Sequence, residues 1–249
     1  MNIISTSLNK AHYHNLKKEL SKRILTLTKY IPVLLFLGNE ISYAQQWYFS
    51  FVPNGRHTNS IKILDPTHIV AGGGNEFNDS LQDIFLSSDK GLTWDYGHNF
   101  FNTPWIKSLT FTNTVHGISV GYSGTILKTN DGSKSWLPVS TPINRQFNKV
   151  TYTDPQTFFI VGGSVPRTDT LQTILKSIDS GKTWSVMLDR KGYWLKGIDF
   201  SDATHGIAVG DSGVILRTID GGVNWSTVTS PVIRTFNCIK FIKAFTWRL

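Results

Sequence analysis

The strongest constraint on this chain is a motif that recurs four times, in which an aliphatic run is followed by a tight turn containing Asp and then by Trp. The turn has the pattern Ser/Thr-x-Asp-x-Gly-x-x-Trp, with Ser133 replacing the Gly in the second copy. The tryptophans lie 42, 48 and 41 residues apart, and the copies occupy 84–94, 126–136, 174–184 and 215–225. A period of about 40 to 50 residues is typical of a β-propeller, in which each repeat forms one four-stranded blade.

The segments around each motif predict further short strands. Each repeat divides into four strands, with first strands at 61–64, 109–111, 150–152 and 198–200 and with Gly, Asp-Gly or Pro-containing turns between strands. Short strands with period-two patterning and turns of this kind indicate an all-β fold. We therefore expect a β-propeller with four whole blades, at about 61–102, 105–144, 145–192 and 193–233.

Two partial blades flank these four in the sequence. Residues 47–51 match a fourth strand without its partners, and residues 236–241 match a first strand, within a partial blade at 234–249. In a propeller, strands exchanged between the two chain ends close the ring and cover the sheet edges. Three explanations are open: a truncated product of a longer gene, which we favour, a ring completed by a second chain, or an open arc.

The recurring turn has a structural explanation. The Asp carboxylate accepts hydrogen bonds from nearby backbone N–H groups, and the Gly tolerates the left-handed conformation that closes the turn. The Trp carries a large apolar surface into the seam between neighbouring blades. Because Ser133 replaces the Gly, the second turn is expected to be the most strained. We assign a structural role, rather than a catalytic or metal-binding one, to Asp89, Trp94, Asp131, Trp136, Asp179, Trp184, Asp220 and Trp225.

The N-terminal segment has the order of a secretory signal. Basic residues at 10, 17, 18, 22, 23 and 29 precede an apolar run at 31–37, which leads to Ser42-Tyr43-Ala44. Basic, then apolar, then small-x-small is the pattern of a signal peptide, here with cleavage expected after Ala44. An uncleaved N-terminal anchor or a plain leader is the alternative. We expect residues 1–44 to be a leader, residues 45–249 to be the propeller domain, and the protein to be periplasmic or secreted.

Charge and cysteine content exclude several classes of function. The leader at 1–44 carries half of the net charge of +8, and nothing in 45–249 clusters Lys and Arg as nucleic-acid recognition requires. No run of about 18 apolar residues predicts a membrane span in the mature chain. Cys238 is the single cysteine, so an internal disulfide and a cysteine-based zinc site are excluded. We expect Cys238 to be a small buried residue.

Two histidines are candidates for metal binding. His116 and His205 occupy equivalent positions in two repeats, each directly before a Gly. Because a position that recurs in separate blades is better explained by the needs of a turn, we interpret both as turn residues. We expect neither a metal nor a cofactor.

The repeats resemble a known family. The turns are similar to Asp-box, or bacterial neuraminidase, repeats, and the fuller pattern at 205–225, which begins His-Gly-Ile-Ala-Val-Gly, resembles the photosystem II stability/assembly factor propellers. The resemblance covers about 47–241. It implies a seven-bladed, non-enzymatic propeller, exported to the thylakoid lumen or periplasm, that binds an early reaction-centre subunit. This chain has fewer blades than that family, so its ring would be incomplete.

A candidate binding face follows from blade geometry. The turns between third and fourth strands mark one face, so the opposite face should carry the inserts at 75–83 and 164–173 and the residues that lead into each first strand. Exposed aromatic and arginine side chains there would suit a peptide or a glycan. Alternatively, the two tryptophans among them fill seams between blades. The candidates are Trp105, Arg145, Arg167, Tyr193, Trp194 and Arg234.

The enzyme hypothesis is weaker. Asp-box repeats also occur in sialidases, but a sialidase needs three arginines converging on a carboxylate, a tyrosine nucleophile and a separate acid. Arg217 aligns with Lys128 and Lys176 and is therefore a repeat position. We predict a scaffold without enzymatic activity that binds a protein or peptide, with a glycan-binding or glycan-cleaving propeller as the alternative. A third alternative is an incomplete product that self-associates through open sheet edges.

Overall fold

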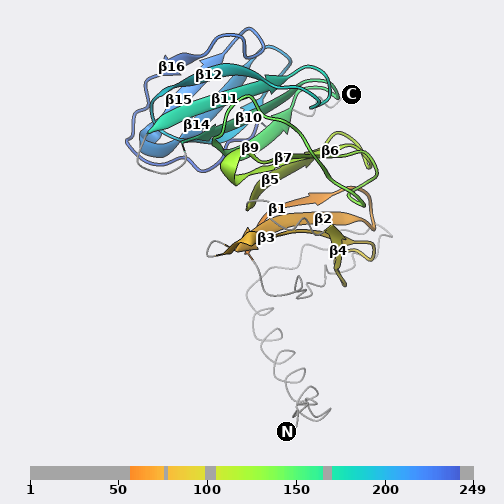
Figure 1. The fold of residues 1–249 in the computed structure, drawn as a ribbon. Coiled ribbons are helices and arrows are strands. Elements are labelled where there is room, and N and C mark those ends of the chain that lie inside the picture. The colour runs from red at the N-terminus through yellow and green to blue at the C-terminus, as the bar shows by residue number, and fades with distance from the viewer. Residues whose placement is uncertain (1–56, 76–77, 99–104, 165–169, 242–249) are drawn as a thin grey trace, which may run out of the picture. The chain divides into compact units, whose positions relative to one another are not determined.

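The structure, a computed structural model, describes residues 57–75, 78–98, 105–164 and 170–241. These residues form four antiparallel sheets of four strands each, with the strands in chain order (Figure 1). Blade 1 contains β1 (His57–Ile63), β2 (Ile69–Asn75), β3 (Asn78–Ser87) and β4 (Asp95–His98). Blade 2 contains β5 (Ile106–Phe111), β6 (Gly117–Gly121), β7 (Ile126–Thr129) and β8 (Leu137–Pro138). Blade 3 contains β9 (Gln146–Tyr152), β10 (Phe158–Gly163), β11 (Leu171–Ser177) and β12 (Ser185–Lys191). Blade 4 contains β13 (Leu195–Phe200), β14 (Gly206–Gly210), β15 (Ile215–Thr218) and β16 (Ser226–Val228).

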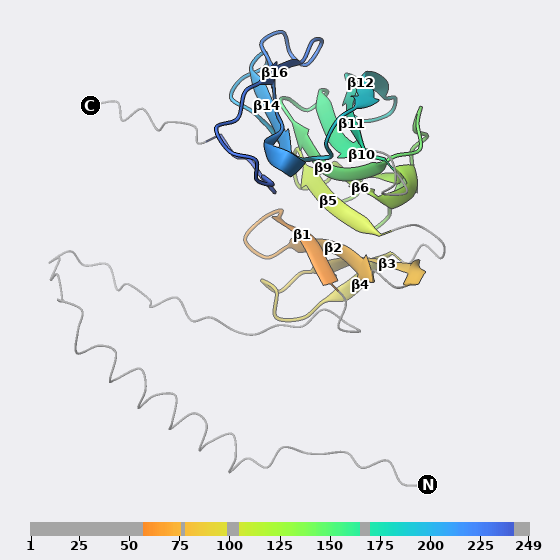
Figure 2. The same ribbon diagram turned by 90° about the vertical axis from the view of Figure 1, so that its left-hand side faces the viewer.

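Consecutive blades meet at their inner strands, β1, β5, β9 and β13. β1 contacts β5, β5 contacts β9, and β9 contacts β13. The first three lie side by side in both views (Figures 1 and 2). Successive four-stranded sheets joined at their first strands define a β-propeller. The prediction of an all-β propeller with four whole blades is confirmed.

Each seam between blades is filled by one cluster of buried apolar side chains that includes the tryptophan of the later blade. These tryptophans are at most 8% exposed. Burial of a ring this large stabilises the packing of one sheet on the next. The three clusters contain Val70 and Trp136, Ile118 and Trp184, and Phe159 and Trp225, respectively, so each includes residues of both blades.

The Asp of each recurring turn organises the turn by hydrogen bonding. Asp179 Oδ1 accepts from Ser177 Oγ at 2.8 Å and from the Thr183 N–H at 2.9 Å. Partial burial opposes ionisation of Asp179, but these bonds and that from the Thr183 hydroxyl lower its pKa to about 2. Asp89 and Asp220, at equivalent positions, also have pKa values of about 2 because of bonds from Thr93 and Asn224. The ionised carboxylates therefore stabilise the turns.

The second turn holds one non-glycine residue in the left-handed region, but so do the first and third turns, at Lys90 and Ser180, so the expectation that it is the most strained is not supported. Ser133 has a φ of 77°, the same value as Gly181 at the equivalent position. A side chain in this left-handed region is unfavourable. Ser133 Oγ compensates in part, because it accepts a hydrogen bond from Trp136 Nε1 at 2.9 Å.

Long basic side chains cross the same seams. Lys128 Nζ on β7 donates to the Ser180 carbonyl of blade 3 at 2.8 Å, and Lys176 Nζ on β11 donates to the Gly221 carbonyl of blade 4 at 2.7 Å. Each acceptor belongs to the Asp turn of the next blade. The lysines at this repeat position are therefore connectors between blades.

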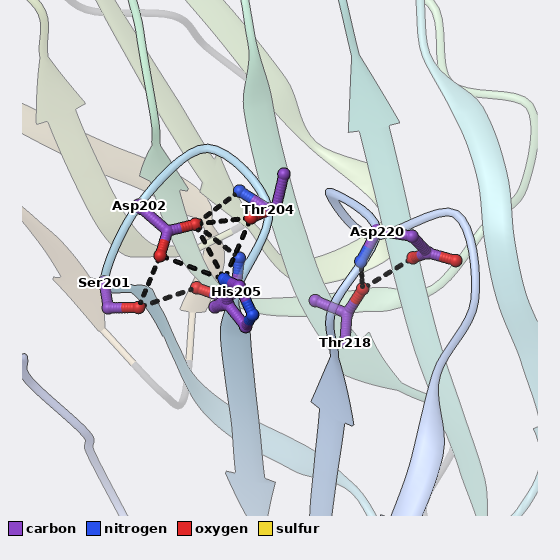
Figure 3. Close-up of polar contacts among 6 residues, drawn as sticks. All are labelled: Ser201, Asp202, Thr204, His205, Thr218 and Asp220. Atoms are coloured by element: carbon purple, nitrogen blue, oxygen red, sulfur yellow. Dashed lines mark hydrogen bonds and ion pairs between the residues drawn. The ribbon is translucent and has the colours of Figure 1, made fainter.

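The turns between first and second strands explain the two histidines. The His205 N–H donates to Asp202 Oδ1 at 2.8 Å, and His205 Nδ1 lies 3.0 Å from Asp202 Oδ2 (Figure 3). In blade 2 the His116 N–H donates to Asn113 Oδ1 at 2.8 Å in the same way. Figure 3 also shows the neighbouring turn, where Thr218 Oγ1 donates to Asp220 Oδ1. Both histidines are engaged within their own turns.

Two expectations for the C-terminal segment are wrong. Residues 236–241 form no strand. They run beside β13, with the Phe236 N–H donating to the Gly210 carbonyl at 2.9 Å and the Phe241 N–H donating to Asp199 Oδ2 at 2.7 Å. Cys238 is exposed rather than buried. Side chains alternate between the two faces of a strand, but a side chain is buried only where another sheet covers its face.

Several predictions concern residues outside the described part of the chain. These are the leader at 1–44, the partial strand at 47–51 and the last residues, 242–249. Within the described ranges, no helix is both long and apolar enough to cross a membrane.

Candidate functional site: a cleft at the inner strands

Each inner strand contains a β-bulge at an equivalent position. Its pairing with the second strand skips one residue, which is Asn59 in β1, Lys107 in β5, Asn148 in β9 and Lys196 in β13. A bulge re-aims the side chain of the unpaired residue. All four bulged residues line one cleft of about 740 Å³. The fold therefore brings one polar side chain from every blade to a common site.

The bulged asparagines connect neighbouring blades. Asn59 Nδ2 donates to the Ile106 carbonyl and Asn148 Nδ2 donates to the Leu195 carbonyl, both at 2.8 Å. Each acceptor is the residue directly before the bulge of the next blade. These amides fix the relative positions of the inner strands and thereby the width of the cleft.

The bulged lysines have different partners in blades 2 and 4. Lys107 Nζ lies 3.7 Å from the centroid of the Trp105 ring, which stacks on Tyr122 at 5.3 Å. Lys196 Nζ forms an ion pair with Asp211 Oδ1 at 2.7 Å. Tyr122 and Asp211 are the first residues of the equivalent 3-10 turns η3 (Tyr122–Gly124) and η4 (Asp211–Gly213). An aromatic face stabilises one ammonium group, and a carboxylate stabilises the other.

Lys149 follows the bulge of β9 and also lines the cleft. Burial, and then repulsion from Lys240, lower the pKa of its ammonium group, while Asp199 acts in the opposite direction. Asp199 is 6% exposed and already accepts from Lys240 Nζ at 3.4 Å and from the Phe241 N–H at 2.7 Å. With the described residues, Lys149 forms no hydrogen bond or ion pair.

The two tryptophans of the predicted binding face fill equivalent seams. A Cβ added to Gly74 would lie 2.6 Å from Cδ1 of Trp105, and one added to Gly163 would lie 2.6 Å from Cδ1 of Trp194. Only glycine fits beneath each indole. Trp194 Nε1 donates to Ser164 Oγ at 3.2 Å. Trp105 is therefore a seam residue, whereas Trp194 fills its seam and also lines the cleft.

The other candidates are distributed differently. Tyr193 lines the cleft and is 49% exposed. Arg145 is bound to Asp189 on β12, with Nη2 to Oδ2 at 2.7 Å and Nε to Oδ1 at 3.1 Å. Arg234 is exposed and does not line the cleft. Arg167 lies outside the described residues. Of the six predicted residues, the cleft thus brings together Tyr193 and Trp194.

The described lining of the cleft consists mainly of amide, ammonium and aromatic side chains. Among its described lining residues, Asp211 has the only carboxylate, and Lys196 is paired with it. Glycoside hydrolysis normally requires two carboxyl groups about 5 to 10 Å apart. The described residues also contain no group of three or more side chains suited to hold a metal ion. Amides, ammonium groups and aromatic rings can instead recognise polar and anionic groups.

Sequence reasoning missed the three lysines of the cleft. The repeat could have identified two of them. Lys107 and Lys196 are 89 residues apart, which is also the spacing between Trp105 and Trp194, each two residues before one of these lysines. For Lys149 there was no such signal, since the equivalent positions hold Ser60, Ser108 and Gly197.

The fold and cleft together define a β-propeller with a polar site at its inner strands. No family model and no curated protein matches the chain. Solved structures do match. YCF48 bound to D1 peptide is similar with a TM-score of 0.54 and 17% identity, covering 72% of this chain and 56% of that one. YCF48 from Cyanidioschyzon merolae matches with a TM-score of 0.56 and 17% identity, covering 80% and 68%. The GH74 enzyme of Niastella koreensis matches with a TM-score of 0.53 and 14% identity, covering 66% and 28%.

These comparisons establish the fold. The chain spans just over half the length of the YCF48 chain bound to D1 peptide and a smaller part of the GH74 enzyme. The propeller expected from the sequence resemblance is therefore confirmed, and it is shared by the YCF48 structures and by the GH74 enzymes. A fold of this kind supports many functions, so function must be argued from the cleft.

Proposed function

We propose that this chain is an exported, non-enzymatic propeller that binds another protein through a peptide segment laid in the cleft, in the manner of an assembly factor. The observation that carries the proposal is the convergence of the four bulged side chains on one cleft, with Tyr193 beside them. Tyrosine gives a large contact area at low entropic cost, which makes exposed Tyr193 a candidate anchor. The D1 peptide bound to the similar YCF48 supports a peptide ligand.

A glycan-cleaving function is the alternative, because GH74 enzymes share the fold. The single carboxylate among the described lining residues argues against it. Reducing-sugar release from xyloglucan by the purified chain tests this alternative directly. Turnover that is lost on one carboxylate substitution would establish the enzyme in place of the scaffold.

The peptide-binding proposal is tested with a displayed library of random peptides. Peptides selected on the wild-type protein should bind the Tyr193→Ala variant at least tenfold more weakly in calorimetry, because that change removes the aromatic anchor. Ile178→Ala is the matched control, since Ile178 is exposed but belongs to an Asp turn. Equal loss in both variants, or no loss in either, would contradict binding in the cleft.

Export rests on the basic, apolar and small-residue order of 1–44. N-terminal sequencing of protein recovered outside the cytoplasm should begin at Gln45. Recovery of uncleaved chain in the cytoplasm alone would contradict this part of the proposal.

A further inference from the structure

The three lysines of the cleft differ in how their charges are compensated. The Lys196 ammonium is neutralised by Asp211 at 2.7 Å. The Lys107 ammonium lies over the Trp105 ring, which stabilises a cation without cancelling its charge. Lys149 has neither kind of partner among the described residues. Lys149 is therefore a cation of the cleft that no described carboxylate binds by a hydrogen bond or ion pair.

The surroundings of Lys149 make its charge costly. It is partly buried, and Lys240 adds repulsion. The carboxylate that attracts it, Asp199, also accepts from Lys240 Nζ at 3.4 Å and from the Phe241 N–H at 2.7 Å. A desolvated ammonium that lacks a hydrogen-bonded anion destabilises the folded protein. A side chain in a cleft wall that destabilises the folded protein is explained if it binds a ligand.

The lining indicates which anion fits. Phosphate groups are typically held by arginine forks or by several cations that converge on them. The described lining contains no arginine, and two of its three lysines lie against Asp211 and Trp105. Beside Lys149 it offers the side chains of Gln146 and Asn148, and Tyr193 and Trp194 provide flat apolar surface. One ammonium group with neighbouring amides suits a monoanion. A carboxylate that belongs to an otherwise uncharged, partly aromatic segment has this chemistry.

We propose that Lys149 anchors a single carboxylate of the bound peptide, and that this contact selects acidic segments over neutral ones. The inference rests on the proposed function, because it names the ligand chemistry of the same cleft. The carboxylate has two possible sources, an Asp or Glu side chain and a free C-terminus. Both present the same two oxygens to the ammonium group.

Three short synthetic peptides of Gly, Ser and Tyr distinguish these sources. The first has one central Glu and an amidated C-terminus, the second has Gln in its place, and the third is the Gln peptide with a free C-terminal carboxylate. Calorimetry at low salt should show the wild-type protein binding one or both carboxylate peptides at least tenfold more tightly than the amidated Gln peptide. The stronger of the two identifies the source.

Lys149→Met tests the assignment to this residue. The variant should bind the three peptides equally, whereas the matched control Lys182→Met, an exposed lysine of an Asp turn, should keep the preference. If wild type binds all three peptides equally, or if Lys149→Met retains the preference, the carboxylate inference is wrong while peptide binding stands. If the wild-type protein binds none of the three peptides and no library peptide either, both the carboxylate inference and the proposed function are wrong.

A ligand-free measurement separates a role in binding from a role in folding. Because Lys149 bears an uncompensated charge, Lys149→Met should raise the midpoint of thermal unfolding relative to wild type and to Lys182→Met. A lower midpoint would show that Lys149 supports the fold, and this would overturn the inference.

Discussion

Removal of the Trp136 indole tests the physical basis of blade packing. The side chain is 0% exposed and lies in the cluster that joins blades 1 and 2. Its ring meets Phe111 edge-on, with centroids 5.8 Å apart. An aromatic side chain buries about 150–250 Å², which at ~25 cal/mol per Å² gives about 4–6 kcal/mol of transfer free energy. Measured substitutions of buried Phe or Trp by Ala cost about 3–5 kcal/mol. We expect Trp136→Ala to lower the free energy of unfolding by about 4 kcal/mol.

The assay is thermal and urea unfolding followed by far-UV circular dichroism, since fluorescence would change with the tryptophan itself. A loss of about 4 kcal/mol corresponds to a fall in the unfolding midpoint of about 8–16 °C for a domain of this size. Leu137→Ala is the control, because Leu137 is the next residue and is 62% exposed. That change should cost less than about 0.5 kcal/mol. A Trp136→Ala variant as stable as the Leu137→Ala variant would refute the role of the indole as a wedge between blades.

Three further outcomes are expected. The pKa values of about 2 at Asp89, Asp179 and Asp220 lie below the unfolded value of about 3.9, so their stabilisation is complete above pH 4 and is lost as pH falls from 4 to 2. Urea midpoints that stay constant across this interval would exclude that linkage. Gly181→Ala should destabilise by about 2–4 kcal/mol, since φ is +77° and a Cβ would lie 2.5 Å from Ile118 Cδ1; chemical denaturation measures this. The midpoint of thermal unfolding should be about 2–4 °C higher for Lys149→Met than for wild type. An unchanged midpoint would contradict the destabilisation that we attribute to the Lys149 charge.

The sequence predicts the blades well because their determinants are local. Asp179 and Trp184 are five residues apart, and a turn that depends on such spacing can be recognised without knowing the fold. The seam positions of Trp136, Trp184 and Trp225 follow from repetition of the same unit. The fold class was therefore accessible from the repeat.

The candidate site depends on contacts that the sequence does not display. The pairing of Arg145 with Asp189 joins residues 44 positions apart, so an arginine expected on a binding face is held within its own blade. The bulges at Lys107 and Lys196 interrupt the alternation of apolar and polar residues by which a strand is recognised in a sequence. The predicted first strands of these two blades therefore begin later in the sequence than β5 and β13 do in the structure. Cys238 was expected to be buried because alternation alone assumes a covering sheet.

The bulges have an implication for how such a protein can change its ligand. At Asn59, Lys107, Asn148 and Lys196 the backbone ladder is already interrupted, so the sheet does not depend on a particular side chain at those points. Exchange of the residue there alters what the cleft recognises and leaves the interior of each blade untouched. The chain itself holds an example, because the bulge presents an amide in blades 1 and 3 and an ammonium group in blades 2 and 4. Selectivity and strand pairing within a blade can thus change independently, whereas exchange of Asn59 or Asn148 would also remove a hydrogen bond to the next blade.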